Sequence, residues 1–425
     1  MNWRGGIRIA RIIARLNVGG PAIQAILMTE ALRARGYNTV LITGQVGRGE
    51  ANMHYLAQAH EVEALTIPAL SRSICYKDIA SLLQLVRMLR RHRPAIVHTH
   101  TAKAGTLGRL AAMIVRAPIR VHTFHGHVFN GYFSPFVSGI FLRIERFLAR
   151  RTDCIIAISE SQKRELTETY RIAPAHKVTI IPLGLDLDAF LKANASDDTV
   201  HNAIRRDPSV PLVGWVGRLT AIKAPGLFLD CVPLVKDSFP ATHFVVVGGG
   251  ELHSECEQRV EQERLQDSVA LLGWQRDLPR IYAGLEMVVC TSINEGTPVA
   301  LLEAMASGKA IVSTDVGGVR DLMAGRPNPI EGMELFENGI LVPRDPQLLA
   351  RAILYLLGNR DQCRSMGQVG RQFVRNRYSQ IRLADDLERL YLSLARAKGL
   401  LPKDAVFPAC PPSTSVFSAP HTPSL

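Results

Sequence analysis

Short apolar runs alternate with turn residues and helical stretches along this chain, and they do so in two separate series. The first series has apolar runs at 7–16, 39–43, 95–100, 119–126 and 154–159, and it ends at 178–190. The second series has runs at 211–219, 242–250, 269–274, 287–292 and 310–315. Such alternation predicts an α/β fold in which helices cover both faces of a mainly parallel sheet.

A polar stretch at 193–209 separates the two series. We therefore expect two Rossmann-like doubly wound domains that face each other across a cleft. The first would span 1–187 and the second 188–400, with the last helix packing back on the first domain. Residues 401–425 are rich in Pro, Ser and Thr, which predicts a disordered tail. Ligands of open α/β sheets bind beyond the carboxyl ends of the strands, so the cleft is the expected site.

The net positive charge of the protein lies entirely in the first half of the chain. Residues 1–190 contain 25 Lys and Arg against 12 Asp and Glu, whereas 191–425 contain 25 against 26. A one-sided basic field attracts an acidic partner, which can be nucleic acid, anionic lipid or a phosphorylated substrate. No recognisable nucleic-acid-binding motif is present, so no nucleic-acid partner is expected.

Cysteine usage and the N-terminus predict a cytoplasmic protein. The seven cysteines contain no C-x-x-C pair, which disfavours a disulfide framework or a zinc site. Arginines interrupt the apolar run near the N-terminus, so no signal-peptide core is expected. No apolar stretch reaches the ~18 residues of a membrane span. Attachment to the inner face of a membrane remains compatible with these features.

The most informative segment is NEGTPVALLEAMASGKAIVSTDVGG, residues 294–318. Glu295 follows a predicted strand, Pro298 is suited to begin a helix, and Glu303 would lie on its first turns. Free N–H groups at a helix start favour an anion, and two carboxylates can accept hydrogen bonds from diols. The segment therefore suits a sugar nucleotide. The alternative is a loop charge followed by a solvent-facing helix residue.

A second segment, VGRLTAIK at 216–223, contains two cations after a predicted strand. Arg218 and Lys223 flank a short loop, where they could bracket a diphosphate. Taken alone, such a pair is more often a solvated surface pair. Its position in the same series as Glu295 and Glu303 favours the phosphate interpretation.

Together these motifs resemble those of retaining glycosyltransferases of family 4, which have the GT-B fold and use nucleotide-sugar donors. Glu295 and Glu303 match the E-x7-E motif of that family, and Arg218 and Lys223 match its G-R-x4-K element. The resemblance extends over about residues 8–398. The family also has a glycine-rich turn, matched here by Gly19 and Gly20, and a histidine at a strand end, matched by His125.

The resemblance implies a role for each matched residue. Glu303 would bind the ribose hydroxyls and Glu295 the sugar hydroxyls, while Arg218 and Lys223 would neutralise the departing diphosphate. His125 would orient the donor or acceptor. The backbone of the helix start would also lie near the donor, at Gly296, Thr297, Pro298 and Val299.

The family also implies a metal-independent, retaining hexosyltransferase without a cofactor. The donor would be a nucleotide sugar, with UDP-linked sugars favoured over GDP-linked ones. The acceptor would be a glycan, which can be lipid-linked, in the synthesis of a cell-surface polysaccharide or glycolipid. A sugar-nucleotide 2-epimerase of the same fold is the alternative enzyme.

Residues for the acceptor side are less well defined. His98 and His100 share one face of a strand end, and Lys103 follows them, so all three are candidates to face the acceptor. Residues 132–151 and 81–93 combine apolar residues at helical spacing with arginines. Such helices can lie at an anionic membrane surface. Alternatively, their apolar stripes pack on the sheet of the first domain.

Overall fold

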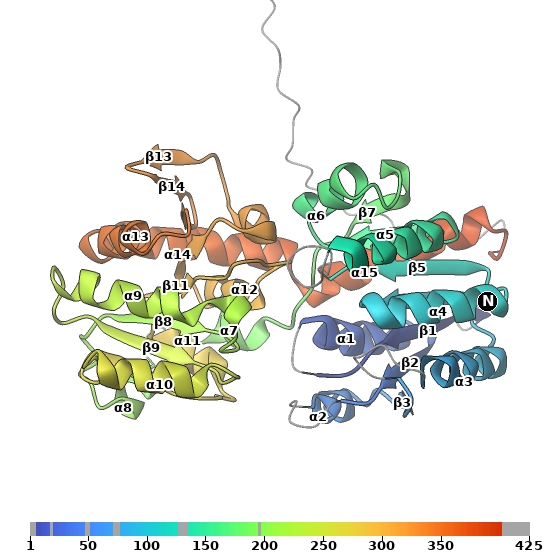
Figure 1. Cartoon of the computed structure of the whole chain (residues 1–425), viewed down its shortest axis with the longest axis horizontal. Coiled ribbons are helices and arrows are strands. Elements are labelled where there is room, and N and C mark those ends of the chain that lie inside the picture. The colour runs from blue at the N-terminus through green and yellow to red at the C-terminus, as the bar shows by residue number, and fades with distance from the viewer. Residues whose placement is uncertain are drawn as a thin grey trace, which may run out of the picture.

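The computed structural model describes residues 6–17, 20–46, 52–70, 77–125, 135–193 and 197–401. They form two α/β units that lie side by side (Figure 1). The first unit contains a seven-stranded parallel sheet with the order β3-β2-β1-β4-β5-β6-β7. Its strands are β1 (Arg8–Ile13), β2 (Asn38–Gly44), β3 (Ala64–Ile67), β4 (Ile96–His100), β5 (Ile119–Thr123), β6 (Cys154–Ala157) and β7 (Val178–Ile180).

The second unit contains an eight-stranded sheet with the order β10-β9-β8-β11-β12-β15-β14-β13. Its first six strands in that order are parallel, and the β13–β14–β15 edge is antiparallel. The strands are β8 (Leu212–Val216), β9 (His243–Val247), β10 (Val269–Leu271), β11 (Met287–Cys290), β12 (Ala310–Thr314), β13 (Asn328–Ile330), β14 (Met333–Phe336) and β15 (Gly339–Val342).

Helices cover both sheets. Those of the first unit are α1 (Gly20–Ala34), α2 (His54–Ala59), α3 (Lys77–His92), α4 (Ala102–Ile114), α5 (Pro135–Arg150) and α6 (Glu160–Arg164). After the first sheet come α7 (Asp188–Lys192), α8 (Thr199–Ala203), α9 (Pro225–Lys236), α10 (His253–Gln262), α11 (Leu278–Gly284), α12 (Val299–Ala306), α13 (Pro346–Gly358), α14 (Arg360–Arg377) and α15 (Gln380–Ala397). This arrangement confirms the predicted α/β class with two doubly wound Rossmann-like sheets.

Strand order explains where a ligand can bind. In each sheet the chain winds outward in one direction and then returns to the centre, so that β1 lies beside β4 and β8 beside β11. Crevices at such reversal points, beyond the carboxyl ends of the strands, are the usual ligand sites of open sheets. The apolar runs predicted most of these strands. β3 and the β13–β15 edge were not predicted. β3 and β13 are the outermost strands of their sheets and are largely not buried, so they lack the apolar run of a central strand.

The last helix returns to the first sheet. Leu383, Leu387 and Tyr391 of α15 belong to the same buried cluster as Ile9 of β1. Arg35, the residue after α1, donates to Glu388 of α15 at 2.8 Å. Figure 1 shows α15 lying across the unit that contains β1. Apolar burial and this ion pair therefore fasten the C-terminal helix to the first unit.

Candidate active site

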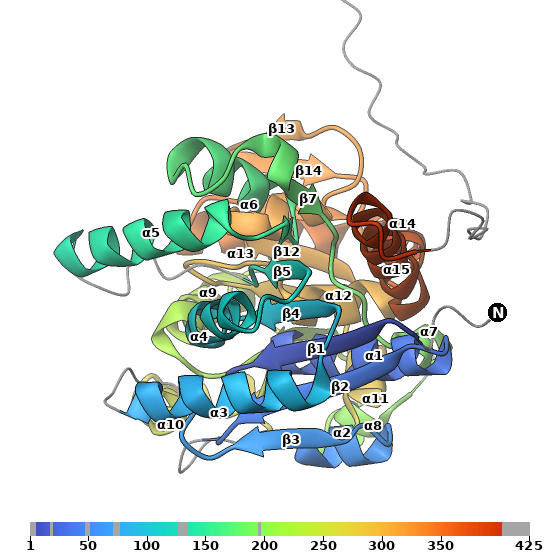
Figure 2. The same cartoon turned by 90° about the vertical axis from the view of Figure 1, so that its right-hand side faces the viewer.

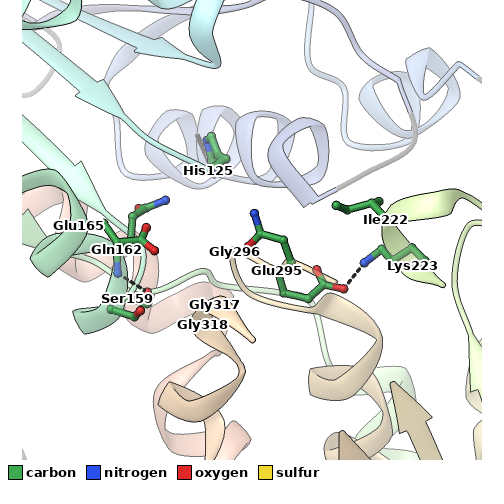
Figure 3. Close-up of a pocket in the computed structure, with 12 residues that line it drawn as sticks. His125, Ser159, Gln162, Glu165, Ile222, Lys223, Glu295, Gly296, Gly317 and Gly318 are labelled. Carbon is green, nitrogen blue, oxygen red and sulfur yellow. Dashed lines mark hydrogen bonds and ion pairs between the residues drawn. The ribbon is translucent and has the colours of Figure 1, made fainter. Parts of the chain in front are cut away.

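A cavity of about 240 Å³ lies between the two units. Its walls come from segments that follow strands in both sheets (Figure 3). Twelve residues line it: His125, Ser159, Ser161, Gln162, Glu165, Ile222, Lys223, Asn294, Glu295, Gly296, Gly317 and Gly318. Four of the predicted site residues, namely His125, Lys223, Glu295 and Gly296, thus meet around one space although they lie far apart in the sequence.

Glu295 and Lys223 form an ion pair on the wall that the second unit contributes. The ammonium group of Lys223 donates to Oε1 of Glu295, and Ser292 Oγ donates to the same oxygen at 2.5 Å. The Glu295 side chain is 8% exposed, whereas that of Lys223 is 31% exposed. Lys223 can therefore turn toward an anionic ligand, while Glu295 stays fixed with its second oxygen available to a hydroxyl group.

Two glycines allow the loops behind this wall to approach one another. A Cβ atom on Gly317 would lie 2.0 Å from the carbonyl oxygen of Glu295, and one on Gly318 would lie 1.8 Å from that of Gly296. No side chain fits at these separations. Gly296 itself lies against the first unit, since its Cβ would be 2.9 Å from the carbonyl oxygen of His125. The glycines thus set the narrow spacing of the cleft.

Glu303 lies on α12, beneath this wall. It accepts a hydrogen bond from the hydroxyl group of Tyr282 at 3.0 Å, and Tyr282 is fully buried. Burial raises the pKa of Glu303 to about 7, although the Tyr282 bond acts in the opposite direction. The carboxyl group is therefore close to half-ionised at neutral pH. The sequence offered no signal for Tyr282 as its partner, because 21 residues separate them.

Helix α12 begins where the sequence predicted. Pro298 is its N-cap and Val299 its first residue, with Thr297 just before them. The start of α1 lies directly opposite, because a Cβ on Gly20 would be 3.2 Å from the Cγ2 atom of Val299. Gly20 is therefore at the domain junction, next to the start of α12. Gly19 lies outside the described residues.

The opposite wall of the cavity comes from the start of α6, which sequence reasoning missed. Ser159 caps this helix, its Oγ accepting from the backbone N–H of Gln162 at 3.1 Å. The backbone N–H of Ser161 donates across the domain junction to Asp321 at 3.1 Å. A serine after an apolar strand and three residues before glutamine is an N-cap signal, which could have located this wall.

His125 reaches the cavity from the end of β5. Its Nε2 lies 2.8 Å from Nδ1 of His100, on the neighbouring strand. Burial lowers the pKa of His125 to about 3, and the positive charge of Arg11 adds to this effect. His125 is therefore neutral at physiological pH. His127, two residues further along the sequence, lies outside the described residues.

The remaining candidates do not line this cavity. His98 and His100 are each 1% exposed, so both lie inside the sheet rather than facing an acceptor. The structure differs here from the expectation, because helices cover both faces of a doubly wound sheet. Lys103 pairs with Asp78 of α3 at 2.5 Å instead of facing open solvent. Arg218 is exposed on the loop after β8.

Comparison of this architecture with solved structures identifies the GT-B fold. The Anabaena protein Alr3699/HepE in complex with UDP superposes with a TM-score of 0.73 at 20% identity, covering 91% of this chain and all of that one. A glycosyltransferase from Rickettsia africae gives a TM-score of 0.74 at 19% identity, covering 92% of this chain and 99% of that one. At such identities the likeness concerns the fold alone.

Sequence comparison then defines the family. Residues 18–189 match the family described as Glycosyltransferase Family 4, and residues 210–359 match Glycosyl transferases group 1. A UDP-Gal:alpha-D-GlcNAc-diphosphoundecaprenol alpha-1,3-galactosyltransferase of Escherichia coli is 30% identical over 68% of this chain and 76% of its own length. The capsular polysaccharide biosynthesis glycosyltransferase CapM of Staphylococcus aureus is 26% identical over 77% and 84%. The chain therefore belongs to the family 4 glycosyltransferases.

Proposed function

We propose that the protein transfers a hexose from a UDP-linked donor to a glycan carried on a lipid diphosphate, with retention of the anomeric configuration. The observation that supports this function is the cavity in which Lys223, Glu295 and His125 meet, with Glu303 beneath it. A cation, a fixed carboxylate and a second carboxyl near a helix start match the diphosphate, sugar and ribose of such a donor. The Escherichia coli relative supplies the acceptor class, since its name specifies a diphosphoundecaprenol-linked sugar.

In this reaction the bond between the sugar C1 and the diphosphate oxygen breaks, and a new bond forms from C1 to the acceptor oxygen on the same face. The acceptor proton passes to an oxygen of the leaving diphosphate, so no side chain acts as a nucleophile. Lys223 stabilises the charge that develops on the diphosphate. Arg218 approaches the diphosphate from the exposed loop after β8. No metal ion or other cofactor takes part in the proposed reaction.

Product analysis tests this function. The full-length protein is incubated with UDP-glucose, UDP-galactose or their N-acetyl forms and a synthetic sugar-diphospholipid. We expect one donor to give an extended lipid product whose anomeric coupling constant matches that of the donor. Release of a free epimer without transfer would favour the 2-epimerase alternative. Absence of both transfer and UDP binding would refute the proposal.

Helix α5 supports a membrane-bound acceptor, because its apolar row faces outward. Four apolar side chains on one face are exposed: Phe136, Ile140, Ile144 and Phe147. The acidic residue of the helix, Glu145, instead points inward and binds Arg109 of α4 at 2.6 and 2.8 Å. Figure 2 shows α5 extending along the outer side of the first unit, with α4 and α3 below it.

We propose that this face rests on an anionic membrane. Arg143 and Arg150 are exposed on the same helix, next to the apolar row. Apolar groups that enter the interface and cations that meet lipid phosphates would act together there. In the described part of the chain, no helix combines the length and apolar character needed to cross a bilayer.

Vesicle flotation tests the membrane surface. Wild-type protein should float with vesicles containing phosphatidylglycerol and remain unbound with neutral phosphatidylcholine vesicles, and added salt should weaken binding. Replacing Phe136 and Ile140 by Ser should abolish flotation while UDP binding persists. Ile381→Ser is the matched control, since Ile381 is 73% exposed on α15. Flotation of the double variant at wild-type levels would refute this surface.

A further inference from the structure

Arg11 is a buried cation whose neighbours are neutral. It lies on β1 with 2% of its surface exposed. Its guanidinium group contacts His98 Nδ1 at 3.4 Å, His100 Nε2 at 3.1 Å and the Tyr391 hydroxyl at 3.3 Å. Among the described residues, no carboxylate forms an ion pair with it. Burying a charge without a counter-ion is costly, so this arrangement calls for a role other than stability.

A hydrogen-bonded chain connects Arg11 to the cavity. Arg11 contacts Nε2 of His100, and Nδ1 of His100 lies 2.8 Å from Nε2 of His125, which lines the cavity. The centres of the two imidazole rings are 5.1 Å apart, so the two nitrogens lie between the rings, as an edge-to-edge hydrogen bond requires. This hydrogen-bonded chain thus passes from β1 through β4 to the end of β5.

The chemistry of arginine fixes the direction of every bond in this chain. A guanidinium group has only donors and keeps its proton in proteins. Nε2 of His100 must therefore accept, which leaves the proton of a neutral imidazole on Nδ1. That N–H can only donate to Nε2 of His125. His125 must then accept at Nε2 and carry its own proton on Nδ1.

Both histidines stay neutral, as this argument requires. Burial holds the pKa of His100 well below its usual range, with His98 and Arg11 contributing. For His125 the pKa falls to about 3, through burial and the charge of Arg11. The tautomer of each ring is therefore set by its neighbour and not by titration.

The Nδ1 atom of His125 is the last atom of this hydrogen-bonded chain. It is buried and has no hydrogen-bond partner among the residues that the structure describes. An unsatisfied buried polar group beside a ligand cavity indicates that a ligand completes it. By the argument above, this atom offers a donor.

We propose that Arg11 is a positioning residue that fixes the tautomers of His100 and His125, so that His125 meets the substrate as a hydrogen-bond donor through Nδ1 and not as a proton acceptor. The partner would be an oxygen of the bound sugar nucleotide or of the acceptor. This inference rests on the proposed glycosyl transfer for its catalytic consequence. The tautomer itself can be measured without any substrate.

Nitrogen NMR on the full-length protein, labelled with ¹⁵N-histidine, gives the primary test. The His125 signals are assigned by their loss in His125→Ala. We expect Nδ1 of His125 to show the chemical shift of a protonated nitrogen and Nε2 to show that of an unprotonated nitrogen. A wild-type His125 protonated at Nε2 would overturn the proposal, even if the enzyme proves to transfer glycosyl groups as proposed.

Variants at Arg11 separate a positioning role from a structural one. In Arg11→Met the donor is lost, so both His125 tautomers should become detectable and transfer should fall ~10- to 100-fold, with UDP affinity unchanged. Arg11→Lys retains a donor-only cation and should keep the Nδ1–H tautomer. Tyr391→Phe removes a contact of Arg11 that does not lie on the path from Arg11 through His100 to His125, and it serves as control. A lower melting temperature in Arg11→Met with an unchanged tautomer would instead indicate a purely structural role.

The two hypotheses fail in different ways. If wild-type protein shows no transfer and no UDP binding, the proposed function is refuted, while the NMR result still decides the tautomer. If transfer occurs and Arg11→Met retains full activity, the catalytic part of the inference is refuted. If Arg11→Met fails to fold, Arg11→Lys and the wild-type spectrum still decide the question.

Discussion

The raised pKa of Glu303 makes nucleoside binding depend on pH in a direction that can be calculated. With a pKa of about 7, the carboxyl group is about one-tenth ionised at ~pH 6, half ionised at ~pH 7 and about nine-tenths ionised at ~pH 8. A ribose diol donates two hydrogen bonds, which the ionised form accepts better than the protonated form. The apparent affinity for the nucleoside scales with the fraction of protein in which Glu303 is ionised. The dissociation constant should therefore fall roughly tenfold from ~pH 6 to ~pH 8.

Calorimetry with uridine is the suitable assay, because a phosphate group would itself titrate near pH 6. Wild-type protein should bind uridine ~10-fold more tightly at pH 8 than at pH 6. Glu303→Gln should bind weakly at both pH values, since its amide is always neutral. Tyr282→Phe removes the bond that lowers the pKa of Glu303, so its binding curve should shift to higher pH. Equal uridine affinity at both pH values in the wild type would refute a ribose role for Glu303.

Three further predictions concern the cavity walls. Lys223→Gln should weaken UDP binding ~10- to 100-fold. Arg218→Gln should weaken it less, since Arg218 is the more exposed. Calorimetry measures both affinities, and equal losses would contradict this order. Glu295→Gln should leave UDP affinity within about threefold but lower turnover of the full sugar nucleotide strongly, which a coupled UDP-release assay measures. Gly318→Ala would place a methyl group 1.8 Å from a carbonyl oxygen, so its melting temperature and UDP affinity should both fall; wild-type values for both would refute the packing argument.

Ionisation of Glu303 also costs the folded state free energy. Its folded pKa lies above its ordinary value of 4.5, so the folded protein binds the proton more tightly than the unfolded chain between these values. Stability from this group is therefore full below about pH 4.5 and declines as pH rises toward 7. Glu303→Gln should consequently raise the free energy of unfolding at pH 8, by up to ~3 kcal/mol. Chemical denaturation at pH 5 and 8 measures this, and a variant less stable than the wild type at pH 8 would contradict it.

Apolar periodicity predicted the two sheets because parallel strands are buried on both faces. The runs at 242–250 and 310–315 contain strands β9 and β12, which are buried along their whole length. Motif spacing predicted Glu295 and Lys223 for the same site, since both follow strands of one sheet. The wall from α6 was not predicted, because its position depends on how the two units dock. The hydrogen bond from Ser161 to Asp321 joins positions 160 residues apart, and no local pattern encodes it.

The buried histidines show a second limit of sequence reasoning. His98 and His100 were expected to face an acceptor because they share one face of a strand end. Their environment is instead set by Arg11, whose charge would be unfavourable beside protonated imidazoles and is compatible with neutral ones that accept its N–H bonds. An arginine within an apolar strand was the one signal available in the sequence. It was interpreted only as evidence against a signal-peptide core, and its contacts with the two histidines were not predicted.

Helix α5 shows why the direction of an amphipathic helix cannot be read from periodicity alone. Its apolar row recurs at helical spacing, which is equally consistent with packing on a sheet and with facing a membrane. The direction is decided by Glu145, whose side chain is 6% exposed and bound to the buried Arg109. Turning the helix to bury Phe136 and Ile140 would expose this ion pair and separate its partners. Because a buried charge left without its partner is strongly destabilising, the pair holds the apolar row outward.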